Sequence, residues 1–403
     1  MRAVIEPHPL RGQAVIPSSK SVAHRMMIAA ALSQAPTEIR MNGINEDIEA
    51  TASCLNALGA KIDFSESGCR VTPVGKLKST DCVLDCGESG STLRFLLPAA
   101  AALGASCTVL ARGRLPERPH EILLRALRKH GVRVEDAGWP LHIGGRLTGG
   151  EFVIAGNVSS QYITGLMMAL PLCPQDSEIR LTTPLESAAY VNLTLDVLAQ
   201  FGIRAEKIGG GWRVFGNQRY QSPKVAAVEG DWSGAAVWLA ANAMGMEVEC
   251  GGLNLDSPQA DRAVLDLLKK LGGEIDVSDA PDAAPALAAA AALYEGETRL
   301  IGASRLRLKE SDRLHAMAEM LGALGVRVRE SESELTVFGG KSIRGGEVNG
   351  YRDHRIVMAA AILGAAAEGP VAVTDVEAVK KSYPNFFETF RALGGKVRVE
   401  SDR

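Results

Sequence analysis

The sequence predicts an α/β (α+β) protein built of two similar domains, each made of three repeated units. Two observations predict this fold class: a motif that ends a helix at glycine recurs six times, and a residue that opens an alanine-rich helix recurs six times between those glycines. A third observation, the length of 403 residues, sets the number of domains, because single hydrophobic cores rarely grow beyond about 250–300 residues. Six units divide equally between two cores.

The glycine motif consists of Leu or Phe, three further residues and glycine. Its glycines are Gly59, Gly131, Gly202, Gly272, Gly325 and Gly394. Glycine is favoured just after a helix because it adopts the left-handed conformation that a Cβ resists. An apolar residue precedes five of the six glycines, with His130 as the exception, and alternating segments typical of strands follow. Each motif therefore predicts the end of an amphipathic helix.

The second recurring feature is a polar or charged residue that precedes each alanine-rich run. These residues are Lys20, Ser91, Ser160, Asp231, Asp282 and Asp353, spaced by 71, 69, 71, 51 and 71 residues. Alanine-rich runs such as Thr92 to Leu103 follow them and predict buried helices. The interval before Asp282 is shorter than the others by about 19 residues, which predicts the loss of a strand pair from the fourth unit.

The units divide the chain into two domains. We expect a first domain at residues 18–222 and a second at residues 1–17 plus 223–403, with a hinge at residues 17–20 and 222–230. The 19 residues before Lys20 and the nine after Gly394 together equal one connecting segment, so the N-terminal strands are expected to belong with the C-terminal unit. A cleft between two domains is a common place for a small-molecule site.

Charge, hydropathy and cysteine usage exclude several classes of protein. The formal net charge of −3 and 5% aromatic residues argue against a nucleic-acid binder. No secretion signal or membrane-spanning apolar run is present, so we expect a cytoplasmic protein without a membrane partner. Seven cysteines are an odd number and favour reduced thiols over a disulfide framework. Cys82 and Cys86 lack zinc-site spacing and are interpreted as buried thiols, and no metal is expected.

Polar and cationic motifs occur at the same phase of successive units. If the inner helices of three units run parallel, their N-termini converge and form an anion site. The motifs are Ser-Lys-Ser-x-x-x-Arg at 19–25, Gly-Ser-Thr-Leu-Arg at 90–94, Arg-Leu-Pro-Glu-Arg-Pro at 114–119, Ser-Ser-Gln at 159–161, Pro-Asp-Ala at 281–283, Lys-Glu-Ser-Asp-Arg at 309–313, Asp-His-Arg at 353–355 and Lys-Ser-Tyr-Pro at 381–384. Taken singly, Ser159, Ser160, Asp282 and Asp353 could be N-caps, and Lys309 to Arg313 a solvated turn. Their shared phase favours a binding site.

Taken together and in this order, the motifs resemble those of the 5-enolpyruvylshikimate-3-phosphate synthases, the enolpyruvyl transferases of the shikimate pathway. The resemblance covers almost the whole chain. It implies two domains, each a pseudo-threefold arrangement of βαβαββ-like units around parallel inner helices, of the inside-out α/β barrel type. It also implies a monomer without metal or organic cofactor, whose partners are phosphoenolpyruvate and shikimate 3-phosphate.

The resemblance implies roles for individual residues. Shikimate 3-phosphate, held mainly by the first domain, is expected to contact Lys20, Ser21, Arg25, Ser159, Ser160, Gln161, Ser187, Tyr190, Asp282 and Lys309. Phosphoenolpyruvate, held partly by the second domain, is expected to contact Lys20, Gly90, Arg114, Gln161, Arg313, His354, Arg355 and Lys381. Guanidinium groups suit both substrates because they bind carboxylate and phosphate in bidentate fashion.

The implied reaction adds the 5-hydroxyl of shikimate 3-phosphate to C2 of phosphoenolpyruvate and then eliminates phosphate from the tetrahedral adduct. Asp282 is expected to take the hydroxyl proton and Glu310 to protonate the methylene carbon, with Lys20 assisting proton transfer. Lys309 and Arg313 should lower the pKa of Glu310, whereas an acid needs it raised, so burial or substrate charge must counter them.

Two positions depart from the family pattern. Glu88 stands where asparagine is common beside the phosphoenolpyruvate site, and Arg305 stands where asparagine is common beside shikimate. Gly90 is expected to leave room for the inhibitor glyphosate, which predicts sensitivity to it.

Two rival functions remain open on the sequence. The related enzymes that transfer enolpyruvate to UDP-N-acetylglucosamine often carry a cysteine in the loop matching Arg112 to Pro119, and this loop has none. A non-catalytic scaffold that binds an anionic partner would use the same cations. Asp282 and Glu310 argue against the scaffold, because carboxylates weaken anion binding whereas acid/base chemistry requires them.

Overall fold

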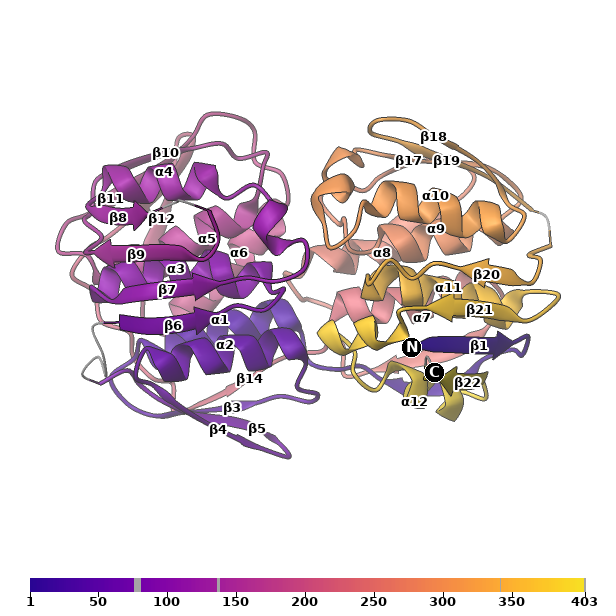
Figure 1. The fold of residues 1–403 in the computed structure, drawn as a ribbon, viewed down its shortest axis with the longest axis horizontal. Coiled ribbons are helices and arrows are strands. Elements are labelled where there is room, and N and C mark those ends of the chain that lie inside the picture. Colours follow the sequence, from indigo (N-terminus) through magenta and orange to yellow (C-terminus); the bar gives the residue numbers. More distant parts are fainter. Residues whose placement is uncertain (76–80, 136–137, 341, 402–403) are drawn as a thin grey trace. The chain divides into compact units, whose positions relative to one another are not determined.

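The computed structural model describes residues 1–75, 81–135, 138–340 and 342–401, and the chain folds into two units. Residues 20–228 form one unit, here called the middle unit, and residues 1–19 with 229–403 form the other, the terminal unit. Each unit has its own hydrophobic core, and the alanine-rich helices lie in both cores. The α/β fold class predicted from the repeats is confirmed (Figure 1).

The described residues of the middle unit form three inner helices, three outer helices and three four-stranded sheets. The helices are α1 (Lys20–Ala31), α2 (Glu46–Ala57), α3 (Gly90–Leu103), α4 (Glu121–Lys129), α5 (Ser160–Ala169) and α6 (Ala188–Gln200), with short 3₁₀ turns η1 (Leu115–Glu117) and η2 (Leu170–Leu172). The strands are β3 (Thr37–Arg40), β4 (Lys61–Ser65), β5 (Gly68–Thr72), β6 (Asp81–Asp85), β7 (Ser106–Leu110), β8 (Val132–Glu135), β9 (Leu141–Gly145), β10 (Glu151–Ile154), β11 (Ser177–Leu181), β12 (Ala205–Ile208), β13 (Gly211–Val214) and β14 (Val225–Ala227).

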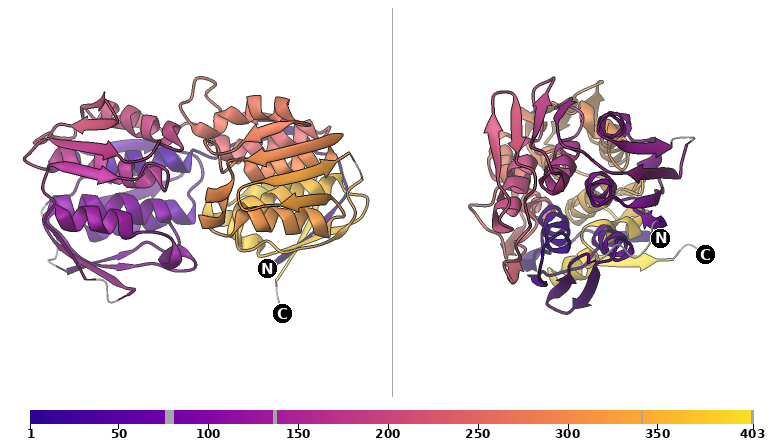
Figure 2. Two further views of the ribbon diagram at one scale, coloured as in Figure 1. Left: turned by 90° about the horizontal axis from the view of Figure 1, so that it is seen from above. Right: turned by 90° about the vertical axis from the view of Figure 1, so that its left-hand side faces the viewer.

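Each of the three sheets repeats one strand order: β14-β3-β5-β4, β6-β7-β9-β8 and β10-β11-β13-β12. The first pair is parallel and the other two are antiparallel. Helices α1, α3 and α5 are buried over most of their length, whereas α2, α4 and α6 bury one face. Figure 2 (right) shows the helices of this unit nearly end on, with strands outside them.

The terminal unit repeats this plan with one exception. Its helices are α7 (Trp232–Ala243), α8 (Val264–Leu267), α9 (Ala284–Leu293), α10 (Arg313–Ala323), α11 (His354–Ala366) and α12 (Phe386–Ala392), and its 3₁₀ turns are η3 (Ala260–Ala263), η4 (Leu268–Lys270), η5 (Ser304–Leu308) and η6 (Val376–Lys381). Its strands are β1 (Arg2–Glu6), β2 (Arg11–Val15), β15 (Glu247–Gly251), β16 (Glu274–Asp276), β17 (Gly296–Ile301), β18 (Arg327–Glu330), β19 (Leu335–Gly339), β20 (Gly346–Val348), β21 (Val371–Thr374) and β22 (Lys396–Glu400).

The exception is the fourth unit of the repeat. Two sheets, β16-β17-β19-β18 and β20-β21-β1-β22, keep four strands, but the third has only β15 and β2. The hairpin that would follow α8 and η4 and pair with β15 is absent among the described residues, which confirms the predicted loss of a strand pair. The side chain of Asn242 instead bonds to both backbone polar groups of Val248 in β15, at 2.8 and 2.7 Å.

The expectation that both N-terminal strands join the C-terminal unit is correct for β1 and wrong for β2. Strand β1 lies between β21 and β22, antiparallel to both. Strand β2 pairs in parallel with β15 of the fourth unit instead. The physical reason is that each sheet needs a parallel edge strand from the preceding connection, and β2 supplies it for β15 as β14 does for β3.

The glycine motif ends helices as predicted. All six glycines have positive φ, from 73° at Gly202 to 103° at Gly59. The side chains that cap the inner helices are Ser89, Ser159, Asp231 and Asp353, so the openers Ser91 and Ser160 lie one or two residues inside their helices. Asp282 is not an N-cap, because α9 begins after Ala283.

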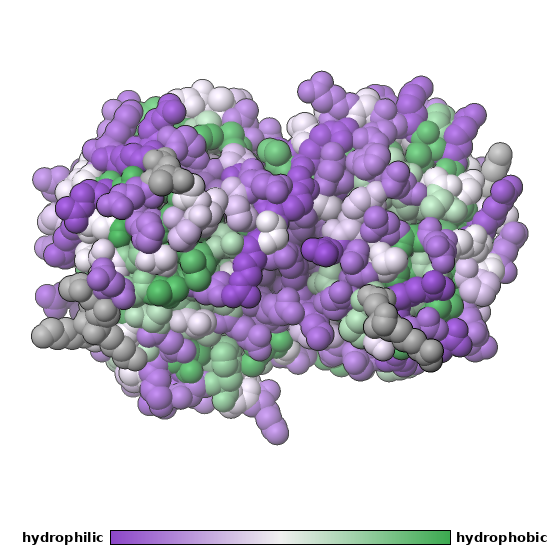
Figure 3. Space-filling view, viewed as in Figure 1, coloured by the Kyte–Doolittle hydropathy of each residue, from purple (hydrophilic) through white to green (hydrophobic). Residues whose placement is uncertain are grey.

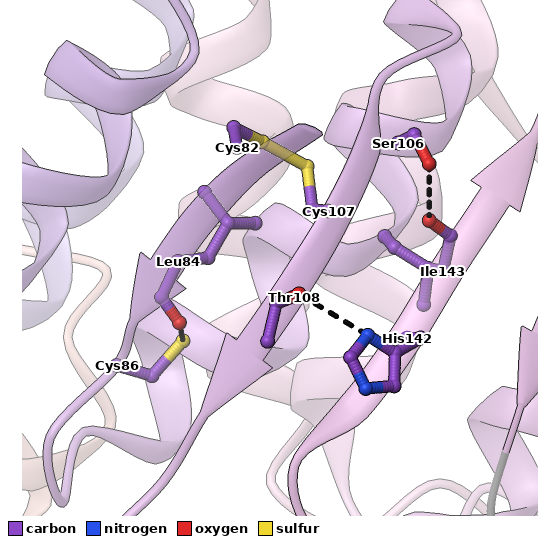
Figure 4. The surroundings of a disulfide bond; sticks show 8 residues. All are labelled: Cys82, Leu84, Cys86, Ser106, Cys107, Thr108, His142 and Ile143. Carbon is purple, nitrogen blue, oxygen red and sulfur yellow. Dashed lines mark hydrogen bonds between the residues drawn. A yellow bond between two sulfur atoms is a disulfide. The ribbon is translucent and has the colours of Figure 1, made fainter. Parts of the chain in front are cut away.

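The cysteines correct a second expectation. Cys82 and Cys107 lie opposite each other on β6 and β7 and form a disulfide, with their Cα atoms 4.5 Å apart (Figure 4). The prediction of reduced thiols is therefore wrong for this pair, because the register that aligns two cysteines cannot be inferred from their spacing of 25 residues. Cys86 is a buried free thiol, as expected, and Cys54, Cys69, Cys173 and Cys250 are also free.

Hydrophilic side chains cover much of the surface seen in Figure 3. Among the described residues, no helix is both long and apolar enough to cross a membrane.

Candidate active site

The middle unit gathers predicted residues at the N-terminal ends of α1, α3 and α5. We call Lys20, Arg25, Gly90, Arg118 and Gln161 the middle cluster. Lys20 opens α1, and its Nζ lies 2.7 Å from Oδ2 of Asp47 in the first turn of α2. Asp47 was not predicted from the sequence, because nothing local links it to Lys20.

Arg25 lies one turn further along α1 and is buried, with 2% of its surface exposed. Its Nε donates to Oγ1 of Thr194 at 2.8 Å, and its Nη2 donates to Oγ1 of Thr164 at 3.2 Å and to the carbonyl of Tyr190 at 3.1 Å. Its Nη1 donates to the carbonyl of Ser21 at 2.7 Å. Burial lowers the pKa of Arg25 to about 9, and all four oxygen partners are neutral.

Gln161 is positioned by close packing of α5 against α3. A Cβ at Gly165 would overlap the carbonyl oxygen of Arg94, so glycine lets the two helices approach. Arg94 then donates from Nη1 to Oε1 of Gln161 at 2.6 Å, and Nε2 of Gln161 donates to Oγ of Ser91 at 2.9 Å. The predicted neighbours Ser159 and Ser160 are buried at the same helix start.

Ser187 and Tyr190 lie at the start of α6. Ser187 is buried and adopts a left-handed conformation, with φ of 57°, just before the helix. The carbonyl of Tyr190 accepts from Arg25, which joins α6 to α1. These two predicted residues therefore lie next to the middle cluster.

Gly90 lies beside Arg118, which was not among the residues predicted to contact phosphoenolpyruvate. A Cβ at Gly90 would lie 3.1 Å from Nη1 of Arg118, a tight contact. Arg114 is 43% exposed and lies 3.8 Å from Glu117. The loop is held by His120, which bonds to the carbonyl of Leu115 at 2.7 Å, and by Trp139, which donates to the carbonyl of Pro116 at 3.1 Å.

Burial lowers the pKa of His120 to about 4, so this ring is neutral near pH 7. Arg118 was within the sequence motif, but only the folded loop shows which of its two arginines adjoins Gly90. The side chain of Glu88 lies against Gly113 in the same region, since a Cβ there would overlap it.

The terminal unit contains a second cluster, at the starts of α9, α10 and α11. We call Asp282, Lys309, Glu310, Arg313 and Arg355, with their partner Asp353, the terminal cluster. Its centre is Arg313, which is 1% exposed. Arg313 donates from Nη1 to Asp282 at 2.6 Å, from Nη2 to Glu310 at 2.8 Å and from Nε to Asp353 at 2.8 Å.

The charges in this cluster shift one another's protonation. Burial alone would raise the pKa of Asp282, but Lys309, Arg313 and Arg355 hold it well below its usual value. Burial opposes the charge of Arg313, but Asp353, Glu310 and Asp282 hold its pKa well above the usual value. Burial lowers the pKa of Lys309, whose Nζ lies 3.1 Å from Asp282.

Asp353 caps α11 and orients the residues that follow it. Its Oδ1 accepts from the backbone N–H of Arg355 at 2.9 Å, and its Oδ2 accepts from the hydroxyl of Ser311 at 2.9 Å. The guanidinium of Arg355 does not bond to Asp353 and instead donates to the carbonyl of Ser233 at 2.5 Å. His354 and Lys381 are buried in the same unit, at the start of α11 and the end of η6.

Asp282 and Glu310 are both bonded to the buried guanidinium of Arg313. This arrangement suits proton transfer, because the protonation states of both carboxylates depend on the same cation. No group of three His, Cys, Asp or Glu side chains that could hold a metal occurs among the residues described.

Comparisons with known proteins decide the family. The family model described as EPSP synthase (3-phosphoshikimate 1-carboxyvinyltransferase) matches residues 4–279 and 272–390. The chain belongs to the EPSP synthase family.

Two curated members of the EPSP synthase family illustrate the similarity. A 3-phosphoshikimate 1-carboxyvinyltransferase of Clostridium kluyveri is 40% identical over 417 residues, covering 98% of this chain and 97% of the relative. One from Clostridium perfringens is 39% identical over 425 residues, covering 99% and 100%.

Solved structures agree with the fold of the EPSP synthase family. An EPSP synthase of Acinetobacter baumannii superimposes with a TM-score of 0.82 at 25% identity, covering 99% of this chain and 100% of that one. The enolpyruvyl transferase NikO of Streptomyces tendae superimposes with a TM-score of 0.81, covering 98% of both chains, and at 18% identity it shows the fold alone.

Proposed function

We propose that the chain transfers the enolpyruvyl group of phosphoenolpyruvate to the 5-hydroxyl of shikimate 3-phosphate and releases phosphate. The observation that carries the proposal is the terminal cluster, in which Asp282 and Glu310 share the buried guanidinium of Arg313. Membership of the EPSP synthase family supports the choice of substrates.

The middle cluster supports binding of the sugar phosphate. Lys20, Ser21, Arg25, Ser159, Ser160, Gln161, Ser187 and Tyr190 are proposed to hold shikimate 3-phosphate. In the described part of the chain, Arg25 donates to four neutral oxygens, so its charge is available to attract a phosphate. Gln161 is held by Arg94 and Ser91, which fixes its amide for substrate contact.

Phosphoenolpyruvate is proposed to contact Lys20, Gly90, Gln161, Arg313, His354, Arg355 and Lys381. We add Arg118 to this group, because its guanidinium adjoins Gly90. Arg114 stays a prediction with less support, given its exposure and its pairing with Glu117.

The proposed base is Asp282, with its pKa held low by three cations, so it is ionised at neutral pH and can accept a proton. Its low basicity implies that it takes the proton late, when bonding to C2 has made the hydroxyl acidic. Addition then gives the tetrahedral adduct, and elimination removes a proton from its new methyl group as the C–O bond to phosphate breaks and phosphate leaves.

Glu310 is the proposed acid and must carry a proton to protonate the methylene carbon. Its bond to Arg313 opposes protonation, and the negative charge of the two substrates counters that effect. Lys20 and Lys309 are proposed to balance the charge that develops on phosphate and on the acceptor. We propose that the enzyme acts as a monomer without a cofactor, in the cytoplasm, as the resemblance to the EPSP synthase family implies.

Phosphate release from phosphoenolpyruvate tests the proposal, with shikimate 3-phosphate or UDP-N-acetylglucosamine as the acceptor. We expect release only with shikimate 3-phosphate. Release only with the nucleotide sugar would overturn the assignment, and no release with either acceptor would support the scaffold alternative.

A further inference from the structure

One buried carboxylate of the terminal unit has no role in the proposed chemistry. Asp261 lies in η3 and is 2% exposed. Its Oδ2 accepts a hydrogen bond from the hydroxyl of Ser233, in the first turn of α7. Burying a carboxylate costs free energy, so its presence beside the terminal cluster calls for a function.

Ser233 links Asp261 to Arg355. The carbonyl of Ser233 accepts from Nη1 of Arg355 at 2.5 Å, while its backbone N–H donates to Oδ1 of Asp231 at 3.1 Å. One residue is thus held by a carboxylate at its hydroxyl, a carboxylate at its N–H and a guanidinium at its carbonyl. The position of the Ser233 carbonyl therefore determines the orientation of the Arg355 guanidinium.

Arg355 retains donors for a ligand. It is 5% exposed, and among the described atoms its buried Nε has no hydrogen-bond partner. A buried guanidinium N–H without a partner is costly unless a ligand accepts from it. The bond to Ser233 therefore orients a cation that still has donors free for an anion.

The segment before Asp261 makes this link rigid. Nε2 of Gln259 donates to the carbonyl of Gly230 at 2.8 Å, and its Oε1 accepts from the backbone N–H of Trp232 at 3.2 Å. The indole N–H of Trp232 donates to the carbonyl of Asn254 at 3.0 Å. This segment connects β15 to α8, and its hydrogen bonds to Gly230 and Trp232 fix the first turn of α7.

We propose that Asp261 is a positioning residue that holds Arg355, through Ser233, in the orientation that binds phosphoenolpyruvate. This inference rests on the proposed function, in which Arg355 contacts that substrate. Asp261 does not touch the reacting atoms in this role. It acts by fixing the hydroxyl, and hence the carbonyl, of Ser233.

The charges around Asp261 determine the assay conditions. Asp282, Asp231 and Arg355 act on its carboxyl group, and burial together with Asp282 raises its pKa to about 6. At pH 8 the carboxylate is ionised and can accept from Ser233 with full strength. Steady-state kinetics at pH 8 therefore test the ionised form.

The test compares Asp261→Ala, Asp261→Asn and Ser233→Ala with the matched control Asp266→Asn, an exposed aspartate of α8 that is 77% exposed. We expect Asp261→Ala and Ser233→Ala to raise KM for phosphoenolpyruvate about tenfold, the size expected for loss of a charge-assisted hydrogen bond. KM for shikimate 3-phosphate should change less than about twofold, because that substrate is assigned other contacts.

Asp261→Asn should restore KM for phosphoenolpyruvate to the wild-type value or below it. Its amide oxygen still accepts from Ser233, and it removes a negative charge near an anion. Asp266→Asn should match the wild type in both KM values. Circular dichroism melting of each variant shows which ones are folded.

The outcomes separate this inference from the proposed function. A wild-type chain that releases no phosphate contradicts the proposed function itself. An active wild type combined with a folded Ser233→Ala variant of unchanged KM for phosphoenolpyruvate overturns the positioning role. Equal rises in both KM values for Asp261→Ala would also overturn it, since they would indicate a general structural defect.

Discussion

The two units share one arrangement of helices but surround their buried arginines with different partners. In the middle unit, Arg25 donates to hydroxyl and carbonyl oxygens. In the terminal unit, Arg313 donates to three carboxylates. Neutral partners leave the charge of a guanidinium available to an anionic ligand, whereas carboxylates compensate it. Carboxylates that share one cation also influence each other's pKa. The comparison teaches that the same helix ends can serve binding in one unit and proton transfer in the other.

The largest expected effect is on kcat, which a substitution in the terminal cluster should lower far more than one in the middle unit. Asp282→Asn should lower kcat about 10³-fold, because general-base catalysis contributes about 10²–10⁴-fold. The same change in the middle unit, Asp47→Asn, should cost less than about tenfold, since Asp47 orients Lys20 through one ion pair. Phosphate release under saturating substrates measures both, and equal losses would contradict the division of roles.

The next effect is on stability. Arg313→Met should lower the free energy of unfolding by about 3–5 kcal/mol, because it leaves buried carboxylates without their cation. Arg25→Met should cost about 1–3 kcal/mol, since the groups it leaves are neutral. Urea unfolding at pH 7 measures the difference. A larger loss for Arg25→Met would refute the contrast.

Redox state offers a third comparison, because the strand pairs β6–β7 and β16–β17 are equivalent but only the first has a disulfide. Reduction of Cys82–Cys107 should lower stability by about 3.5 kcal/mol, the entropic value for a loop of this length. Thiol titration in denaturant should find five thiols without reductant and seven with it.

The control for that titration is Cys250→Ser in the terminal unit, which should give four and six thiols. Seven thiols in the unreduced wild type would contradict the bond.

The smallest expected effect concerns pH. The folded-state pKa of Asp261 is raised from 3.8 to about 6, so the folded chain binds a proton more tightly than the unfolded chain does. Stability from this group is therefore present below about pH 4 and is lost as pH rises through about 6, at a total cost of about 3 kcal/mol. Asp261→Asn should thus be more stable than the wild type at pH 7 and equal to it near pH 4. A stability difference that stays constant across this range would count against the shifted pKa.

Local signals made much of the fold predictable. The left-handed conformation after a helix favours glycine, so five of the six motifs predicted the ends of α-helices correctly. The sixth, at Gly272, follows the 3₁₀ turn η4 instead. The short interval before Asp282 likewise predicted the missing hairpin. The pairing of β2 with β15 could not be predicted, because it depends on two segments more than 200 residues apart.

The site was predictable as a set of residue types and less so as a set of partners. The positions of Asp282, Glu310 and Arg313 within the repeat units predicted that they belong to one group, and the structure brings them together. Asp47, Asp261 and the choice of Arg118 over Arg114 beside Gly90 depend on tertiary packing of side chains. The sequence has no periodic signal for such contacts.

The position of β1 between β21 and β22 imposes an order on the folding of the chain during its synthesis. The middle unit has all its residues once position 228 has left the ribosome, whereas the first strand must wait for position 400 before both neighbours exist. At 5–20 residues per second, the residues between the end of β1 and the end of β22 take roughly 20 to 80 s, during which β1 lacks one or both of its neighbours and has exposed edges. Nascent chains of this protein therefore offer a substrate to chaperones that bind extended segments, and the middle unit folds first.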